Sequence, residues 1–233
     1  MSKKYAIIVA GGRGIRLGGE VPKQFLELAG KPVLMHAIDA FLRYDEGIHL
    51  ILVLPETQIS FWNELCRKHN FKQKCPIAKG GETRFHSVKN GLSLIDGEGL
   101  VAIHDGVRPL VSADTISRCF EAAAEHRAAV PVVDSVDSIR QIIDSESIAV
   151  ARENFKLVQT PQVFDVRLLK DAYQQAFTSA FTDDASVVEA FGAKIHLTEG
   201  NRENIKITTV FDLKIAQCLI RHADDADNAD FRR

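Results

Sequence analysis

The chain begins with an apolar run that leads directly into a glycine-rich segment. Residues 5–10 (YAIIVA) have strand length and are rich in Ile and Val, which predicts a buried strand. Five of the nine residues at 11–19 are glycine. Glycines let backbone N–H groups approach a ligand closely, and consecutive N–H groups form an anion-binding concavity. The pattern therefore predicts a phosphate site where a buried strand ends.

Three basic side chains accompany this loop. Arg13, Arg16 and Lys23 lie within eleven residues, and such cations around a backbone concavity favour the binding of several phosphates. The alternative is a plain glycine turn whose cations are only solvated. The segment is not a P-loop, because no lysine follows Gly19. It is not a dinucleotide fingerprint either, because Leu17 occupies the position of the third glycine.

Apolar strands and amphipathic helices alternate along the first half of the chain. We expect strands at residues 5–10, 48–54, 77–79, 100–104 and 129–133, and helices at 33–44, 59–69, 83–95 and 112–127. Such alternation is typical of parallel βαβ units, so the sequence predicts an α/β fold with a Rossmann-like, mostly parallel sheet and helices on both faces. Further helices are expected at 166–177, 183–191 and 212–222, and a strand at 194–198.

The pattern changes at residues 134–156, which we expect to form a β-hairpin arm. Residues 134–151 alternate between polar and apolar around a turn-like segment, DSES, at 144–147. An isolated hairpin is marginal in water, so the arm should pack against a second copy of the chain or fold back on its own domain. Residues 1–222 are then one domain, and the polar residues 223–233 are expected to form a flexible tail.

The composition argues against several classes of protein. A net charge of −2 does not suit a surface that binds nucleic acid. No apolar stretch approaches the roughly 18 residues of a membrane span, so no membrane partner is expected. The eight histidines show no metal-binding spacing. The four cysteines, which contain no C-x-x-C pair, predict reduced thiols in a cytoplasmic protein: Cys66, Cys75, Cys119 and Cys218.

Four segments fall beyond the carboxyl ends of predicted strands, where ligands bind in open α/β sheets. They are residues 11–19, 80–81 and 104–105, and the turn after Thr198. We expect them to converge on one site. Asp105 ends an apolar strand, where a carboxylate needs a partner. It could hold Mg²⁺, bind hydroxyl groups of ribose or a polyol, or pair with Arg108. His104 is expected to be a packed core histidine.

Six motifs in order along the chain make a specific combined signal. They are AGGRGIRLG with PKQF (10–18 and 22–25), GGETRFHSV (80–88), HDGVRP (104–109), QTPQVF (159–164), TDDAS (182–186) and GNRENIKIT (200–208). With these motifs the chain, to about Arg221, resembles the cytidylyltransferases that activate small polyol phosphates. The resemblance implies a fold of the nucleotide-diphospho-sugar transferase type and the two substrates CTP and a polyol phosphate.

The resemblance implies a CTP site with Mg²⁺ as cofactor. The nucleotide-binding residues would be Ala10, Gly11, Gly12, Gly14, Gly81, Glu82, Ser87 and Asp105. Glu82 stands where relatives often carry Asp, and Ser87 taken alone could be a serine on a helix surface. Mg²⁺ would be held mainly by the CTP phosphates, with no side-chain ligand assigned.

The resemblance also implies four catalytic residues. Arg16 and Lys23 would stabilise the charge growing at the α-phosphate and on pyrophosphate, while Arg152 and Lys206 would hold the attacking phosphate. Lys206 taken alone would be a solvated strand residue. The acceptor would contact Asp105, Arg108, Ser138, Arg140, Thr160 and Thr182, with Ser135 as the alternative to Ser138. No general base is needed, because the attacking phosphate oxygen is already anionic.

Two further implications concern the assembly and the acceptor. In the family, residues that match the arm reach the neighbouring subunit, which implies a homodimer. The arm and GNRENIKIT favour methylerythritol phosphate as the acceptor over ribitol 5-phosphate. A sugar-1-phosphate or molybdopterin nucleotidyltransferase is a more distant alternative. A nucleotide-binding module without catalytic activity is the alternative from another class.

Overall fold

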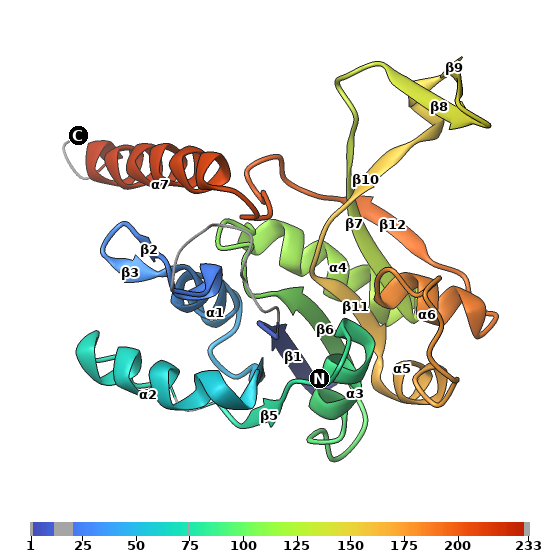
Figure 1. The fold of residues 1–233 in the computed structure, drawn as a ribbon. Coiled ribbons are helices and arrows are strands. Elements are labelled where there is room, and N and C mark those ends of the chain that lie inside the picture. Colours follow the sequence, from blue (N-terminus) through green and yellow to red (C-terminus); the bar gives the residue numbers. More distant parts are fainter. Residues whose placement is uncertain (1, 12–20, 74, 231–233) are drawn as a thin grey trace.

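The computed structural model describes residues 2–11, 21–73 and 75–230, with side chains up to residue 220. The main sheet has the strand order β10-β7-β11-β6-β1-β4-β5, and β12 pairs with β7 in addition (Figure 1). Four of these strands are parallel neighbours, as the alternation predicts: β1 (Lys4–Val9), β4 (His49–Leu54), β5 (Ile77–Lys79) and β6 (Leu100–Asp105). Their carboxyl ends therefore meet at one edge of the sheet.

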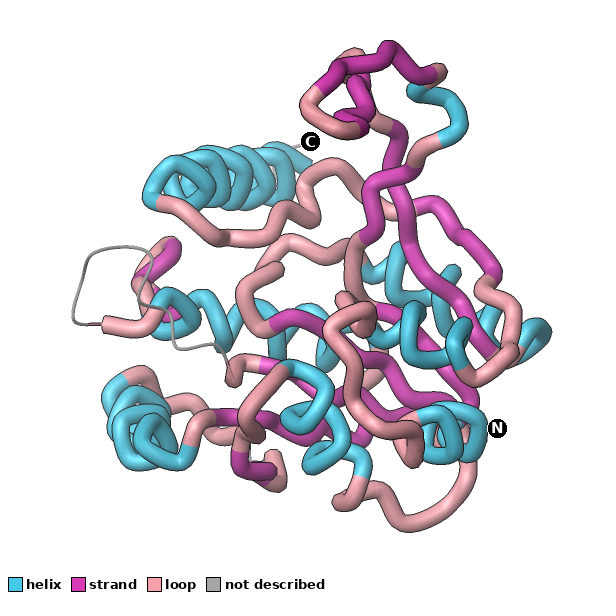
Figure 2. Tube along the Cα trace, turned by 45° about the vertical axis from the view of Figure 1, so that its right-hand side comes forward, coloured by secondary structure: helices cyan, strands magenta, loops and turns pink. Residues whose placement is uncertain are grey.

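Helices cover both faces of this sheet, which confirms the predicted architecture (Figure 2). On one face, α1 (Val33–Tyr44), α2 (Ile59–Lys68) and α4 (Ala113–His126) contribute to a core that includes Ile8 of β1. On the other face, α3 (Arg84–Leu92), α5 (Val166–Ala172) and α6 (Asp184–Ala190) contribute to a core that includes Ile7. Successive residues of a strand point to opposite faces, so β1 serves both cores.

The centre of the sheet contains a strand that the sequence pattern does not reveal. β11 (Gln162–Asp165) lies antiparallel between β6 and β7 (Ala128–Asp134). It is only four residues long, and its place depends on pairing with strands distant in sequence. On β7, β12 (His196–Glu199) pairs in parallel and β10 (Lys156–Val158) pairs antiparallel.

The predicted arm is a hairpin that stands clear of the rest of the chain (Figure 1). Its strands β8 (Ile139–Ile143) and β9 (Glu146–Val150) form a separate two-stranded sheet. Both turn residues have positive φ, 47° at Asp144 and 71° at Ser145, which is the backbone of a two-residue type I′ turn. The short helix η4 (Arg152–Asn154) leads from the arm back to β10.

Smaller elements complete the fold. They are η2 (Lys23–Phe25), β2 (Glu27–Leu28), β3 (Lys31–Pro32) and η3 (Glu56–Gln58). The last helix, α7 (Val210–Asp230), continues beyond the predicted end at residue 222, since its alanines favour helix. Among the described helices none is long and apolar enough to cross a membrane. All four cysteines are free thiols, as predicted.

Candidate active site

A cavity of about 330 Å³ lies at the carboxyl ends of β1 and β6. It is lined by Val9, Ala10, Gly11, Lys23, Gln24, Gly81, Glu82, Thr83, Arg84, Ser87, Asp105, Val107 and Lys206. The glycine loop, the Gly-Gly segment after β5, the end of β6 and the segment after β12 thus contribute to one site, as expected from their places in the sequence. Gly12, Gly14 and Arg16 lie outside the described residues.

The segment that carries Lys23 is held against the end of β1. The neighbouring Gln24 is buried, and its amide Nε2 donates to the carbonyl oxygen of Ala10 at 3.1 Å and to Oε1 of Gln58 at 2.7 Å. Phe25 of the same short helix is buried in the core. This anchoring places Lys23 on the wall of the cavity.

Ser87 fixes the glycine segment on the opposite side. Its hydroxyl accepts from the backbone N–H of Gly81 at 3.0 Å and donates to the carbonyl oxygen of Thr83 at 3.0 Å. Because Ser87 is buried, it is not the surface serine that the sequence also allowed. A Cβ at Gly81 would lie 2.4 Å from the Cβ of His86, so only glycine fits where the backbone turns into α3.

Asp105 is a buried carboxylate, and in the part of the chain that the structure describes three cations surround it. Its Oδ2 lies 2.8 Å from Nζ of Lys206 and 3.7 Å from Nε of Arg108, and its Oδ1 lies 3.5 Å from Nε of Arg84. Burial alone would raise the pKa of Asp105, but Arg84, Lys206 and Arg108 outweigh it and hold the pKa well below its usual range. Asp105 is therefore ionised at neutral pH.

His104 orders the turn that follows β6. Burial lowers the pKa of His104 to about 4, so the imidazole is neutral. Its Nε2 lies 3.0 Å from the carbonyl oxygen of Arg108, which can only accept, so Nε2 carries the proton. The hydroxyl of Thr160 accepts from the backbone N–H of Asp105 and donates to Nδ1 of His104. Thr160 thus binds the backbone of Asp105 from outside the cavity and does not line it.

Lys206 does not lie in a strand, contrary to the reading of NIKIT as an alternating strand. The segment is held instead by the N–H of Ile207, which donates to the carbonyl oxygen of Val107, and by the buried amide of Asn204. Nζ of Lys206 reaches the carboxylate of Asp105 across the cavity. Tertiary contacts with the turn after β6 therefore place this lysine in the site.

Comparison with known proteins agrees with this geometry. Residues 5–222 match the model of the 2-C-methyl-D-erythritol 4-phosphate cytidylyltransferase family. The chain belongs to this family. A curated protein of that name from Bacteroides thetaiotaomicron is 59% identical over 94% of this chain and 100% of its own length. Another from Bacteroides fragilis is 60% identical over 93% of this chain and 99% of its own length.

Solved structures show the same fold. The crystal structure of a 4-diphosphocytidyl-2C-methyl-D-erythritol synthase from Anaerococcus prevotii is 28% identical with a TM-score of 0.79, covering 94% of this chain and 99% of that one. The 2-C-methyl-D-erythritol 4-phosphate cytidylyltransferase from Thermus thermophilus is 31% identical with a TM-score of 0.73, covering 95% and 100%. This chain is therefore a nucleotidyltransferase of the isoprenoid precursor pathway.

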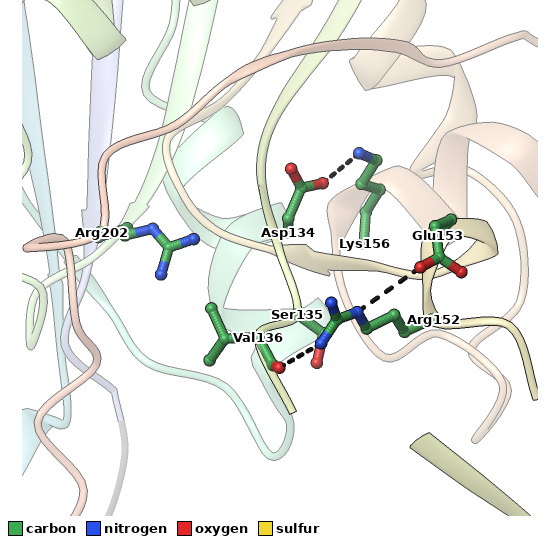
Figure 3. A pocket seen from close by; sticks show the side chains of 7 residues that line it. All are labelled: Asp134, Ser135, Val136, Arg152, Glu153, Lys156 and Arg202. Atoms are coloured by element: carbon green, nitrogen blue, oxygen red, sulfur yellow. Dashed lines mark hydrogen bonds and ion pairs between the residues drawn. The ribbon is translucent and has the colours of Figure 1, made fainter. Parts of the chain in front are cut away.

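The arm residues of this cytidylyltransferase lie outside the cavity of their own chain. Arg140 donates through Nη2 to the carbonyl oxygen of Ser147, and Ser138 lies beside it on the arm. Arg152 donates through Nη1 to the carbonyl oxygen of Val136 at 2.6 Å and pairs with Glu153 at 3.6 Å (Figure 3).

A second cavity, of about 500 Å³, lies at the base of the arm and is lined by Asp134, Ser135, Val136, Arg152, Glu153, Lys156 and Arg202. Thr182 precedes α6 and does not line the cavity at the carboxyl ends of β1 and β6 either.

Sequence reasoning missed Arg84, which lines the cavity and pairs with two carboxylates. Nη2 of Arg84 donates to Oδ2 of Asp184 at 2.6 Å, while Nε faces Asp105. Asp184 is fully buried, and its Oδ1 accepts from the hydroxyl of Tyr173 at 2.6 Å. One signal was available: Arg84 is the first residue of a helix, where the helix dipole disfavours a cation. A cation at that position indicates carboxylate partners nearby.

Proposed function

We propose that the enzyme uses this cavity to transfer the cytidylyl group of CTP to 2-C-methyl-D-erythritol 4-phosphate. An oxygen of the acceptor phosphate forms a bond to the α-phosphorus of CTP, the bond from that phosphorus to the bridging oxygen breaks, and pyrophosphate leaves. The observation that carries the proposal is that Lys23, Asp105 and Lys206, from distant parts of the chain, line one cavity with the glycine segments. Two polyanions can meet only where fixed cations offset their repulsion.

The nucleotide occupies the side of the cavity formed by the glycine segments. Ala10 and Gly11 lie at the end of β1. The N–H of Gly81 and the O–H of Ser87 donate within the chain, so the carbonyl oxygen of Gly81 and the hydroxyl oxygen of Ser87 are left to accept from the amino group of cytosine. Glu82 lies next to them. Gly12, Gly14 and Arg16 complete the phosphate loop in this proposal. Lys23 stabilises the charge that develops at the α-phosphate and on the departing pyrophosphate.

The acceptor occupies the side formed by Asp105 and Lys206. Arg108, which the sequence places among the acceptor contacts, does not line the cavity and pairs with Asp105 instead. Lys206 and Arg152 hold the attacking phosphate, while Asp105 accepts hydrogen bonds from hydroxyl groups of the substrates. Thr182, Ser138 and Arg140 complete the acceptor site. No proton has to be removed from the nucleophile, which fits the neutral, fully bonded His104 behind the site. The rate gain therefore comes from positioning and charge stabilisation.

Mg²⁺ is the cofactor in this proposal. No group of three His, Cys, Asp or Glu side chains in the described residues could hold a metal ion by itself. A magnesium ion that arrives with a nucleotide needs only one or two carboxylates besides phosphate oxygens and water, and Asp105 and Glu82 line the cavity. When bound, Mg²⁺ would offset part of the charge of the triphosphate. The donor set fits that role.

We further propose a single catalytic domain, residues 1–222, that forms a cytoplasmic homodimer through the arm at 134–156. The free thiols support the location. The hairpin register puts Ile139, Ile143, Ile148 and Val150 on one face of the arm. Ile143 and Ile148 are 45% and 48% exposed, so this face is uncovered within one chain. A second copy would cover it and receive Ser138, Arg140 and Arg152 at its acceptor site.

Replacing Ile148 by aspartate is expected to weaken the dimer on the order of tenfold or more, because dimerisation would bury an unpaired carboxylate. The matched control is Ile142→Asp, which places the same charge on the opposite face of the hairpin. Sedimentation velocity over a range of concentrations measures the association. If Ile148→Asp stays as dimeric as the control, the apolar face of the arm is not the interface.

The proposed reaction is tested by measuring pyrophosphate release from CTP with each candidate acceptor. We expect turnover with 2-C-methyl-D-erythritol 4-phosphate, much less with ribitol 5-phosphate, loss in excess EDTA and recovery with added Mg²⁺. Replacing CTP by GTP or UTP tests the base. Binding of CTP without turnover of either polyol phosphate would favour a nucleotide-binding module instead.

A further inference from the structure

We propose that Arg84 is a positioning residue that holds the Asp105 carboxylate in place while Lys206 moves from Asp105 to the acceptor phosphate. The inference rests on the proposed function, because that function gives Lys206 its phosphate. It concerns a residue that lines the cavity and is paired with the carboxylates of Asp105 and Asp184. Its role follows from the way two carboxylates hold one guanidinium.

Two anions compete for Lys206, the carboxylate of Asp105 and the acceptor phosphate. In this structure Nζ of Lys206 lies 2.8 Å from Oδ2 of Asp105, within hydrogen-bonding distance. An ammonium group that stabilises an incoming phosphate has to share or leave this carboxylate. The Lys206 side chain is 43% exposed, whereas Asp105 is 9% exposed. The lysine is therefore the partner that can move into the cavity, and Asp105 stays buried.

A buried carboxylate that loses its closest cation is costly unless other cations remain. Arg84 and Arg108 are those cations. Nε of Arg108 lies 3.7 Å from Oδ2, and its Nη1 is already engaged with the carbonyl oxygen of Asn204 at 2.7 Å. Nε of Arg84 lies 3.5 Å from Oδ1, whereas the 2.8 Å contact of Lys206 is with Oδ2. Arg84 can therefore keep its interaction with Asp105 whichever anion Lys206 holds.

Arg84 lines the cavity, but its guanidinium is tied to a second carboxylate, that of Asp184. Nη2 donates to Oδ2 of Asp184 at 2.6 Å, and Asp184 is fully buried. Burial and the neighbouring Asp184 raise the pKa of Tyr173 well above its ordinary value, so its hydroxyl stays protonated and donates to Oδ1 of Asp184. The Tyr173 ring stacks on Phe85 at 4.6 Å between centroids. The side-chain contacts that run from Asp105 through Arg84 and Asp184 to Tyr173 are thus held by buried groups at both ends.

This series of side-chain contacts connects three elements at the site. Arg84 begins α3, Asp105 ends β6, and Asp184 begins α6, two residues after Thr182. A guanidinium can bridge two carboxylates with its planar fork, whereas the ammonium of lysine is a single point charge. Arg84→Lys therefore keeps the charge beside Asp105 and loses the bridge. Arg84→Gln loses both.

The two variants separate charge from geometry in steady-state kinetics. We expect Arg84→Gln to lower kcat/KM for the polyol phosphate about tenfold or more. The KM for CTP should change less. Arg84→Lys keeps the charge beside Asp105, so it should recover part of the lost kcat/KM but still raise the KM for the acceptor.

The control is Arg127→Gln, which breaks an exposed Arg–Asp pair with Asp165 outside the cavity and should leave both KM values unchanged. Thermal unfolding of each variant measures any loss of stability separately. If Arg84→Gln only lowers the melting temperature and leaves the acceptor KM and kcat unchanged, Arg84 is purely structural. If the acceptor KM of Arg84→Lys equals that of the wild type, the charge alone matters and the positioning role is wrong.

A structural readout keeps this inference separate from the proposed function. Crystals of the wild type and of Arg84→Gln are soaked with inorganic phosphate. We expect Lys206 on the phosphate in both, with the Asp105 carboxylate in place in the wild type and turned away in the variant. An unmoved Asp105 in the variant would overturn the inference even if cytidylyl transfer is confirmed. Absence of cytidylyl transfer by the wild type would refute the proposed function and leave the Asp105 result to decide the role of Arg84.

Discussion

Lys206→Met is expected to lower kcat/KM for the polyol phosphate by about 10²–10³-fold, the loss typical of removing one donor that stabilises charge in the transition state. Methionine keeps the length and apolar stem of lysine, so the segment anchored by Ile207 and Asn204 should stay in place. The variant removes a cation that lies 2.8 Å from the carboxylate of Asp105. Initial rates of pyrophosphate release at varied acceptor concentration measure the effect.

The same variant should also change the pH dependence. Without Lys206 the pKa of Asp105 rises toward its ordinary value, so activity that needs the ionised carboxylate is lost at a higher pH than in the wild type. Lys214→Met, an exposed position on α7, is the matched control. A rate for Lys206→Met within threefold of the control would contradict the assignment of this lysine to the acceptor phosphate.

Lys23→Met is expected to lower kcat by on the order of 10²-fold, with a smaller effect on the KM for CTP. Lys23 lines the cavity at the end of β1, and the buried Gln24 holds its segment to Ala10 whatever the residue at 23. The lost charge would act on the α-phosphate and on pyrophosphate, where negative charge grows during the reaction. Its effect should therefore appear mainly in turnover.

Single-turnover rates, with enzyme in excess over CTP and the acceptor saturating, measure this effect, since product release does not limit them. The control is Lys68→Met, an exposed lysine in the last turn of α2. Turnover by Lys23→Met that equals the control, in a variant that folds like the wild type, would remove Lys23 from the proposed mechanism.

Much of the fold follows from local patterns. The apolar strands β1, β4 and β6 and the helices α1 and α4 lie where periodicity and caps predict them, and Ser112 caps α4 through the backbone N–H of Thr115. The hairpin of the arm is also local, because its turn joins neighbouring strands. By contrast, β11 is short and pairs with distant strands. Nothing in its own four residues indicates its place at the centre of the sheet.

By itself the sequence determined the alternating α/β architecture, the glycine segments at strand ends and the family to which the chain belongs, because these depend on periodicity and on motifs along the chain. Only the tertiary structure decided that Lys206, whose local sequence pattern suggests a strand, lies outside any strand and pairs with Asp105. It also decided that Arg84 joins Asp105 to Asp184. Buried charges select partners by distance in space, and residues 84, 105, 184 and 206 meet only after the sheet has brought α3, β6, α6 and the segment after β12 together.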